Sequence, residues 1–544
     1  MEMTPSDTSN EGQYWYVERR VPEYDKQLTS SATYTSNGAF VDTVTDQRGI
    51  VTKYDYDQNK RLLNSVTTNY GAADDRTVNY TYNANKDLLT KVSQGTVANE
   101  YLYDSLQRLS GIQHNGFQYS FGYDSFGNRI TTKVGSRLLS QNSYNGNNGK
   151  LTKSTYGNGA ELLFKYDRLN RLTENWWNGS KAFTWTYNNA GQVGRHEDLL
   201  NGVTTTYEYD TIGRLMNWRN SSGYEARYAY DLNNNLTEYG YTAFGIPMRY
   251  SYSYGKDDRL ESTSWNRAGK ISYTYDPLNR PTGKQIQSMS SPLAEYTYVD
   301  GSGSNTTTLL ESISGPGYDY SYTYDSYGNI RTISENGTLK VTYTYDEWNQ
   351  LIKEEHSGGD TIEYTYDGGG NLLTKKVNGT VSQTYTYGDS EWKDLLTGFN
   401  GQTITYDAIG NPLSYHNGEG YTFTWKNGRQ LSTLQKGSTG VSYSYNADVL
   451  RVSKTVNGVK TEYAWDGNRL MAQKGSKRLE FLYDGNGLYG LTYGTATYYY
   501  VYNGQGDVVG LADYQGNQVV SYTYDAWGKP LTITGPQAAG IGEL

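Results

Sequence analysis

A short unit that ends in Tyr followed by Asp or Asn recurs along nearly the whole chain, and it limits the fold more than any other feature. Successive units are about 21 residues apart, and a fixed period of this size indicates one supersecondary element used many times. This repeat overrides the three or four ordinary domains that 544 residues would otherwise suggest. The anchors that define the repeat most clearly are Tyr166-Asp167, Tyr209-Asp210, Tyr275-Asp276, Tyr324-Asp325, Tyr345-Asp346, Tyr366-Asp367, Tyr406-Asp407 and Tyr524-Asp525.

Each unit predicts a β-hairpin. The anchor ends a Tyr-x-Tyr alternation such as Tyr322-Thr323-Tyr324, and a period of two is typical of a strand. Three residues after the Asp comes a residue that tolerates the left-handed conformation of a turn, as at Gly213, Gly328, Gly410 and Gly528. A return strand then leads to a second turn, often Asn-Gly, which favours a two-residue hairpin loop. No segment predicts a helix.

The number of units predicts an all-β shell. About twenty units give on the order of forty antiparallel strands, whereas open twisted sheets rarely exceed about ten strands without curling or closing. A continuous ribbon of hairpins that winds on itself removes most exposed edges, and a wide ribbon of this kind leaves a lumen. We therefore expect tandem antiparallel hairpins that spiral into a hollow shell, with a solid coiled rod as the competing geometry.

Composition excludes several classes of function. The chain has 48 Lys and Arg against 57 Asp and Glu, so its net charge of −9 argues against nucleic acid as a partner. Cys is absent, which excludes disulfides and thiolate metal sites, whereas 58 tyrosines argue against disorder. No apolar stretch is long enough to span a bilayer, and the segment at Met1 lacks the features of a secretory signal.

The repeat Tyr324-Asp325-Ser326-Tyr327-Gly328-Asn329-Ile330, with its relative Tyr209-Asp210-Thr211-Ile212-Gly213-Arg214-Leu215, resembles the tyrosine-aspartate (YD) repeat of the Rhs family. That family includes bacterial Rhs and wall-associated polymorphic toxins, the shell subunits of Tc toxins and the animal teneurins. The stretch from Tyr502 to Pro530 is similar to the start of the Rhs-associated core. We divide the chain into an unassigned segment 1–21, a repeat shell 22–535 and a tail 536–544 that ends before the family's core box.

The resemblance implies a non-enzymatic shell that encloses a toxin or effector polypeptide, in cis at the C-terminus of the full-length protein and missing here. It also implies a bacterial protein that is secreted or held at the cell surface, with no signal on this chain. We expect a monomer. The alternatives are a surface adhesin that binds cell-surface glycans, as in teneurin-like cell contact, and a degenerate copy without independent function.

The residues themselves predict no catalytic site, no cofactor and no metal site. The four histidines are far apart in sequence and are interpreted as polar turn residues, while paired acids such as Asp74-Asp75 are interpreted as solvated loop acids. Aromatic side chains could stack on sugars if they are exposed. The candidates for such stacking are Trp176, Trp177, Trp218, Trp265, Trp348 and Trp392.

Overall fold

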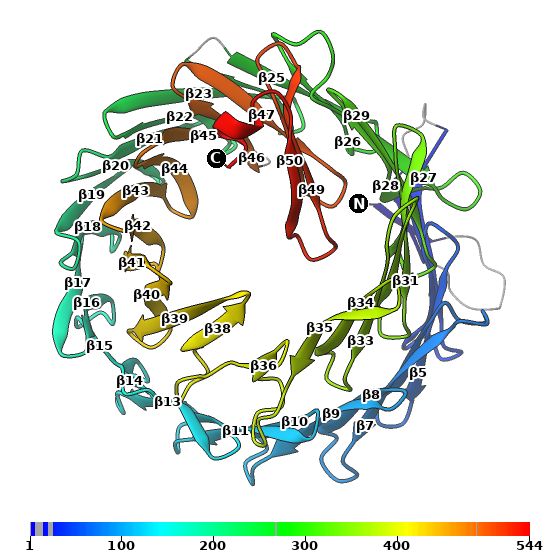
Figure 1. Ribbon diagram of the computed structural model, residues 1–544. Coiled ribbons are helices and arrows are strands. Elements are labelled where there is room, and N and C mark those ends of the chain that lie inside the picture. Colours follow the sequence, from blue (N-terminus) through cyan, green and yellow to red (C-terminus); the bar gives the residue numbers. More distant parts are fainter. Residues whose placement is uncertain (1, 6–14, 20–24, 267–268, 486, 544) are drawn as a thin grey trace.

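The chain folds into one winding ribbon of β-hairpins, seen along its axis in Figure 1. The computed structural model describes residues 2–5, 15–19, 25–266, 269–485 and 487–543. Within these residues there are fifty strands and one helix, α1 (Ala538–Ile541). The expected all-β shell is confirmed. The short helix was not expected, and the strands outnumber the rough forty because hairpins without a Tyr-Asp anchor, such as the one closing at Thr35, add to the count.

The strands pair in chain order, each antiparallel to the one before it, and fall into two sheets. The first sheet contains β1 (Glu2–Pro5), β2 (Trp15–Arg19), β3 (Leu28–Tyr34), β4 (Val41–Thr45), β5 (Val51–Asp57), β6 (Leu62–Thr68), β7 (Arg76–Tyr82), β8 (Leu89–Gln94), β9 (Val97–Tyr103), β10 (Leu109–His114), β11 (Phe117–Tyr123), β12 (Arg129–Val134), β13 (Arg137–Tyr144), β14 (Leu151–Tyr156), β15 (Glu161–Tyr166), β16 (Leu172–Trp177), β17 (Ser180–Tyr187), β18 (Val193–Asp198), β19 (Val203–Tyr209), β20 (Leu215–Asn220), β21 (Glu225–Tyr230), β22 (Leu236–Ala243), β23 (Ile246–Tyr254), β24 (Leu260–Trp265), β25 (Gly269–Tyr275), β26 (Pro281–Ile286), β27 (Ala294–Asp300), β28 (Thr306–Gly315), β29 (Tyr318–Tyr324), β30 (Ile330–Glu335), β31 (Thr338–Tyr345), β32 (Leu351–His356), β33 (Thr361–Tyr366), β34 (Leu372–Val377), β35 (Thr380–Thr386), β36 (Gly398–Phe399) and β37 (Gln402–Thr403).

The second sheet contains β38 (Ser414–Asn417), β39 (Glu419–Lys426), β40 (Gln430–Lys436), β41 (Thr439–Tyr445), β42 (Arg451–Val456), β43 (Val459–Asp466), β44 (Arg469–Lys474), β45 (Arg478–Asp484), β46 (Gly487–Tyr493), β47 (Ala496–Tyr502), β48 (Val508–Ala512), β49 (Gln518–Tyr524) and β50 (Pro530–Thr534). In the segment between the two sheets, Tyr406 pairs with Pro412 in an isolated antiparallel bridge. The first sheet begins within the segment 1–21 that the sequence left unassigned, because β1 pairs with β2 and β2 pairs with β3.

The anchor Asp closes the first turn of each hairpin with its carboxylate. Oδ1 of Asp325 accepts the backbone N–H groups of Tyr327 and Asn329, both at 2.9 Å, and Gly328 closes the turn at φ 85°. Asp167 accepts the corresponding backbone N–H groups of Leu169 and Arg171, and its Oδ2 accepts from the Arg171 guanidinium. These bonds lower the pKa of this carboxyl. All eight anchor aspartates accept the backbone N–H four residues on.

The anchor Tyr links each hairpin to the preceding one. The hydroxyl of Tyr345 donates to the carbonyl oxygen of Ile330 at 3.0 Å, and that of Tyr366 to Leu351 at 2.7 Å. The acceptor is the residue that begins the previous return strand, so the same bond recurs from repeat to repeat. The repeat is therefore explained by local hydrogen bonds as well as by strand pairing.

Replacing Tyr345 by Phe removes this bond and little else. We expect the free energy of unfolding, measured by urea denaturation, to fall by about 1 kcal/mol, the usual net value of one hydrogen bond. The half-exposed Tyr70 supplies the control, because Tyr70→Phe should leave the free energy unchanged. Equal effects of the two substitutions would contradict the role given to the anchor hydroxyl.

The ribbon makes two coils that stack on each other. We call residues 28–286 the first coil and residues 294–534 the second coil. Contacts across the seam between them join residues 277 apart at Arg48 and Asp325, 252 apart at Asn115 and Asp367, and 248 apart at Trp218 and Asp466. The separation then falls to 211 between Tyr273 and Asp484. Within the second coil itself, the backbone N–H of Gly504 donates to the Tyr322 hydroxyl, 182 residues earlier, so the end of this coil winds onto its own beginning. The second coil therefore narrows toward its C-terminal end, and in Figure 1 β38–β50 lie inside the circle of earlier strands.

The largest apolar core fills the seam where the second coil narrows. It combines Tyr250 and Ile271 of the first coil with Met471, Tyr489 and Tyr499 of the second, all nearly inaccessible to solvent. Tyrosine rings take much of the place of aliphatic side chains in this core, as the composition predicts.

Candidate functional site

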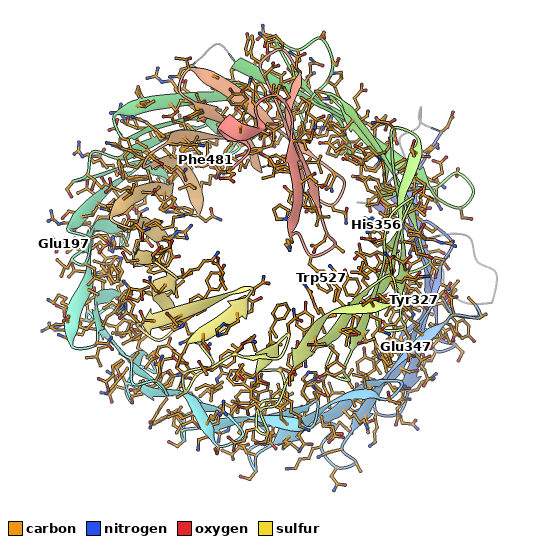
Figure 2. All side chains as sticks on the ribbon, viewed as in Figure 1. Glu197, Tyr327, Glu347, His356, Phe481 and Trp527 are labelled. Carbon is orange, nitrogen blue, oxygen red and sulfur yellow. The ribbon has the colours of Figure 1, made fainter. Side chains whose placement is uncertain are left out.

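The two coils enclose an open space, and this interior of the ring of strands is the first candidate site. With every side chain drawn, the middle of the ring stays open in the view of Figure 2. The β49–β50 hairpin projects into this space, and Trp527 at its tip is 55% exposed. The expected hollow shell is thus confirmed, while the solid rod is not.

The tip of this hairpin is docked on the opposite wall. Lys375 Nζ lies 3.5 Å from Asp525 Oδ2, and both side chains are largely buried. The ring of Trp527 meets that of Tyr364 edge to face, with 5.7 Å between the centroids. The inner hairpin therefore spans part of the interior and is held at its tip by one ion pair and one aromatic contact.

A buried carboxylate supports this docking point. Glu354 is inaccessible to solvent and accepts a hydrogen bond from the Tyr364 hydroxyl, and His356 Nε2 lies 3.2 Å from its other oxygen. Burial and the neighbouring Glu354 raise the pKa of Tyr364 far above its usual value, so this hydroxyl stays a donor. The arrangement fixes the Tyr364 ring on which Trp527 rests.

A second carboxylate, that of the half-buried Asp466, lies in the seam. Asp466 accepts hydrogen bonds from Trp218 Nε1 at 2.8 Å, from the Tyr239 hydroxyl at 2.7 Å and from the Tyr228 hydroxyl. Burial, followed by the Asp466 charge, raises the pKa of Tyr228 and Tyr239. Three ring donors of the first coil thus meet one acceptor of the second coil.

A cavity of about 840 Å³ lies beside this group, between β18–β22 and β41–β44. Its lining includes His196, Tyr207, Tyr224 and Asp448. Burial lowers the pKa of His196, and its Nε2 has no hydrogen-bond partner among the described residues. Its ring stacks on Trp185, with 5.1 Å between the centroids. A neutral imidazole held in this way is a packing group of the wall.

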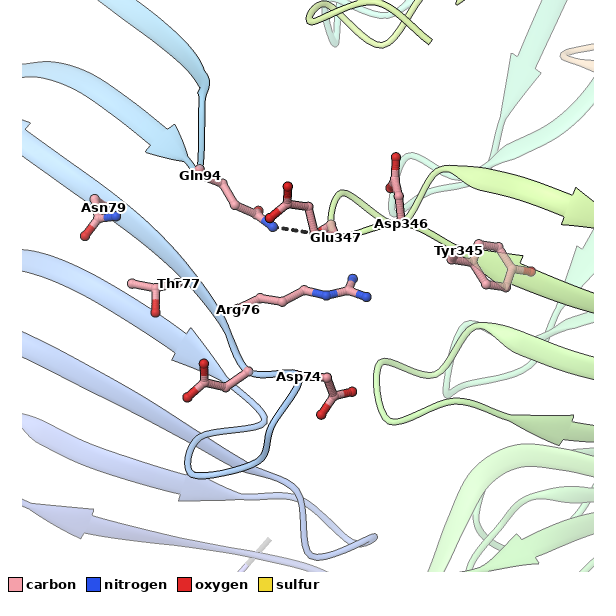
Figure 3. Close-up of a pocket in the computed structure, with 10 residues that line it drawn as sticks. Asp74, Arg76, Thr77, Asn79, Gln94, Tyr345, Asp346 and Glu347 are labelled. Atoms are coloured by element: carbon pink, nitrogen blue, oxygen red, sulfur yellow. Dashed lines mark hydrogen bonds between the residues drawn. The ribbon is translucent and has the colours of Figure 1, made fainter. Parts of the chain in front are cut away.

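A smaller opening of about 530 Å³ marks another point of the seam, shown in Figure 3. Gln94 Nε2 donates to the carbonyl oxygen of Glu347 at 2.5 Å across the opening. The guanidinium of Arg76 stacks 3.6 Å from the centre of the Tyr327 ring. Acidic residues such as Asp74 line this opening as well, so the paired acids expected in a solvated loop lie at the contact between coils.

Three of the six tryptophans named as candidates for sugar stacking are buried. Trp177, Trp218 and Trp265 are buried, with 8%, 7% and 5% of their surface accessible. Trp218 is held by Asp466, and Trp265 packs against Tyr489 and Tyr499 in the core. These rings fill space between coils because the chain has few aliphatic residues to do so.

The other three candidates are half-buried. Trp176 lies beneath Lys165 and Lys181, at 4.5 and 5.3 Å from the two ammonium groups. Lys165, Lys181 and the Trp176 indole also bond Glu174, and they lower the pKa of that carboxyl to about 2. Trp348 and Trp392 donate across the seam, to Gln94 O and to the Tyr119 hydroxyl.

Sequence reasoning missed the interior group of Trp527, Glu354 and Asp525 with Lys375. Trp527 stands two residues after its anchor Asp, the position that Tyr327 and Trp348 hold in other repeats, so an alignment of the repeats could have singled it out. In the described part of the chain, no three His, Asp or Glu side chains gather closely enough to hold a metal ion. None of the described helices is long and apolar enough to cross a membrane.

Comparison with known proteins confirms the resemblance to the Rhs/YD-repeat family. Residues 201–368 match the Teneurin YD-shell family and residues 502–539 match the RHS Repeat family. The chain is 30% identical over 316 residues to the tRNA3(Ser)-specific nuclease WapA of Bacillus spizizenii, and 30% identical over 321 residues to the tRNA(Glu)-specific nuclease WapA of Bacillus subtilis subsp. natto. Each match covers 52% of this chain and 13% of the relative, so the chain spans only a small part of their length.

Solved structures show the same fold over almost the whole chain. The TcdB2-TccC3-Cdc42 structure matches with a TM-score of 0.62 and 14% identity, over 98% of this chain and 34% of that one. The TcdB2-TccC3 structure matches with a TM-score of 0.61 and 14% identity, over the same shares of the two chains. The chain therefore has the Rhs/YD shell fold that is found in toxin assemblies.

Proposed function

We propose that this chain is the non-catalytic wall of a bacterial toxin container, which encloses an effector polypeptide. The observation that carries the proposal is the open interior of the ring, into which the last hairpin projects. Because α1 follows that hairpin and packs against β49, a polypeptide that continued from the C-terminus would begin beside this interior. The proposed partner is thus an effector segment in cis, in a protein that is secreted or held at the cell surface.

The relatives support a toxin context. The WapA proteins are named as tRNA nucleases, and this chain matches 13% of their length. We assign the nuclease activity to other parts of such proteins and the enclosure to the part matched here. The wall acts passively, since it excludes proteases and keeps the effector away from the producing cell.

Protection from protease tests the proposal. A flexible, protease-sensitive segment is fused after Leu544, and in a matched variant the same segment is inserted after Leu232, which is fully exposed in the β21–β22 turn. We expect the C-terminal segment to survive a digestion that removes the inserted one. Equal cleavage of both segments in the folded protein would contradict enclosure.

The alternative function, a surface adhesin that binds glycans, needs accessible aromatic rings. Burial of Trp177, Trp218 and Trp265 removes half of the rings proposed for sugar stacking. A glycan array separates the two functions, because an adhesin binds at least one sugar and a container need bind none.

A further inference from the structure

The hairpins place two kinds of turn on opposite sides of each coil. The Asp-x-x-Gly turns lie on one side, and the Asn-Gly turns lie on the other. In the seam, the Asn-Gly side of the first coil meets the Asp side of the second, as where Asn115 Nδ2 donates to Asp367 Oδ2 at 3.0 Å and Asn158 Nδ2 to Asp407 Oδ2 at 2.8 Å. Two sides remain, which we call the Asp rim of the first coil and the Asn-Gly rim of the second coil.

On the Asp side, one turn position shows the difference between seam and rim. The residue two after the anchor Asp packs onto the neighbouring coil in the seam, where Ile409 is fully buried beside Gly157. At four turns of the Asp rim the same position is exposed and still apolar. Its residues there are Leu106 at 65%, Phe126 at 75%, Leu169 at 71% and Ile212 at 70% exposure. At other turns of this rim the position is polar, as at Asn147 and Asn233, and near the end of the coil Leu278 is buried.

The Asn-Gly side shows the same difference. In the seam, Phe117, the first residue after its Asn-Gly turn, is 6% exposed. On the Asn-Gly rim Val459 holds the same position and is 59% exposed, while Leu339 and Val381, each one position further from its turn, are 44% and 49% exposed. Apolar residues like those of the seam thus recur on both rims and stay exposed there. In the described structure, only the start of the second coil's rim is seen to be covered, where Gly317 in the β28–β29 turn lies against Gln518 of the same chain.

The Asn side chain that donates across the seam also has a counterpart on the Asn-Gly rim. Asn115, which donates across the seam, occupies its Asn-Gly turn at φ 47°, and Asn336 occupies the equivalent turn of the rim at φ 49°. Equal backbone geometry presents the two side-chain amides in the same way. A second molecule that docks on the rim would therefore meet the same kinds of side chain that form the seam within one chain.

We propose that the Asp rim of one molecule docks on the Asn-Gly rim of a second copy of this chain, as a continuation of the seam. The contact is head to tail, so every complex keeps one free rim of each kind and association is open-ended. This inference is independent of the enclosed effector. It differs from the monomer expected from sequence, because exposed apolar side chains gathered along one rim are typical of an interaction surface.

Sedimentation velocity over about a hundredfold range of concentration tests the proposal, because mass action makes open-ended association depend on concentration. We expect species larger than the 61.2 kDa monomer to increase with concentration. The triple variant Phe126→Ser, Leu169→Ser and Ile212→Ser should weaken association by about tenfold or more, since buried apolar anchors carry most interface energy. A monomer throughout the range would overturn the proposal.

A matched control removes the same number of exposed apolar side chains away from the rims. Met216, Leu531 and Ile533 are 45%, 58% and 38% exposed. Their triple substitution by Ser should leave association unchanged, and circular dichroism should show that both triple variants are folded. If the two triple variants weakened association equally, the association would be non-specific and hydrophobic, and the proposal would be overturned.

Complementation gives the sharpest result. The variant Leu339→Ser, Val381→Ser and Val459→Ser lacks the Asn-Gly rim but keeps the Asp rim, and the first triple variant lacks the Asp rim only. Each alone should stay monomeric, whereas their mixture should give a heterodimer that grows no further. Failure of the mixture to form this dimer, with wild-type association intact, would place the interface elsewhere.

Discussion

Asp466→Ala should lower the free energy of unfolding by about 2–4 kcal/mol, because it removes an acceptor from three ring donors, and a buried donor left without an acceptor costs about 1–3 kcal/mol. The donors are Trp218 Nε1 and the hydroxyls of Tyr228 and Tyr239. The largest share falls on Tyr239, which is 4% exposed, whereas Trp218 Nε1 keeps the Tyr228 hydroxyl as a second acceptor at 3.2 Å. Urea denaturation followed by circular dichroism measures the change.

Two further variants make this expectation specific. Asp319 is exposed on β29, and Asp319→Ala should change the free energy by less than about 0.5 kcal/mol, as is usual for surface sites. Asp466→Asn keeps one acceptor oxygen and should recover part of the loss. If Asp466→Ala were as mild as the Asp319 control, the carboxylate would not be what joins the two coils at this point.

Alkaline pH should unfold the shell cooperatively between about pH 10 and pH 12. Burial raises the pKa of Tyr207, Tyr296, Tyr322 and Tyr502 from 10.0 to about 12. A pKa raised in the folded state gives stability that is complete below the unfolded value and is lost as pH rises through the folded one. The folded wall therefore resists ionisation of these rings until it unfolds.

The size of the effect follows from the number of tyrosines. A shift of two pKa units corresponds to at most about 2.7 kcal/mol, and about 2 kcal/mol remains after allowance for solvent screening. Four such rings give about 8 kcal/mol, which is comparable with the whole stability of about 5–15 kcal/mol typical of a protein. Unfolding should thus precede full ionisation.

Phenolate absorbance and circular dichroism recorded on one pH series measure this transition. We expect part of the absorbance to rise together with the loss of strand signal, whereas the urea-unfolded chain should titrate smoothly near pH 10. The idea of a tyrosine core would be wrong if the folded chain titrated like the unfolded one and kept its strand signal.

The repeat unit could be predicted from sequence because its interactions are local. The anchor Asp, the glycine three residues later and the anchor Tyr all act within one or two hairpins, so a pattern in the sequence is enough to find them. Turns whose residues depart from the repeat pattern are harder to predict. Val449 takes the left-handed conformation at φ 62° where other repeats have Gly, and a β-branched residue is rarely found there.

The seam could not be predicted, because its partners are similar units about 250 residues apart. Nothing in the repeat of Trp218 says that Asp466, rather than an equivalent residue one hairpin away, will face it. The pairing depends on how many hairpins complete a coil, which is set by the summed twist of many strands. For the same reason the sequence did not reveal that Trp177, Trp218 and Trp265 are buried, or that Trp527 lies in the interior.

Pairing of each strand with its neighbours in sequence gives the wall an unusual mechanical property. Along the ribbon, the coil is joined by backbone hydrogen bonds, and between coils it is joined largely by side chains such as Asn115 with Asp367. The wall is therefore stiff around its circumference and weaker along its axis. Where the seam is polar, as between Asn115 and Asp367, the coils can separate without breaking a pair of strands, whereas the apolar core of Tyr250 with Met471 holds the narrow end together. An enclosed polypeptide would then leave through the polar part of the seam without unfolding of the wall.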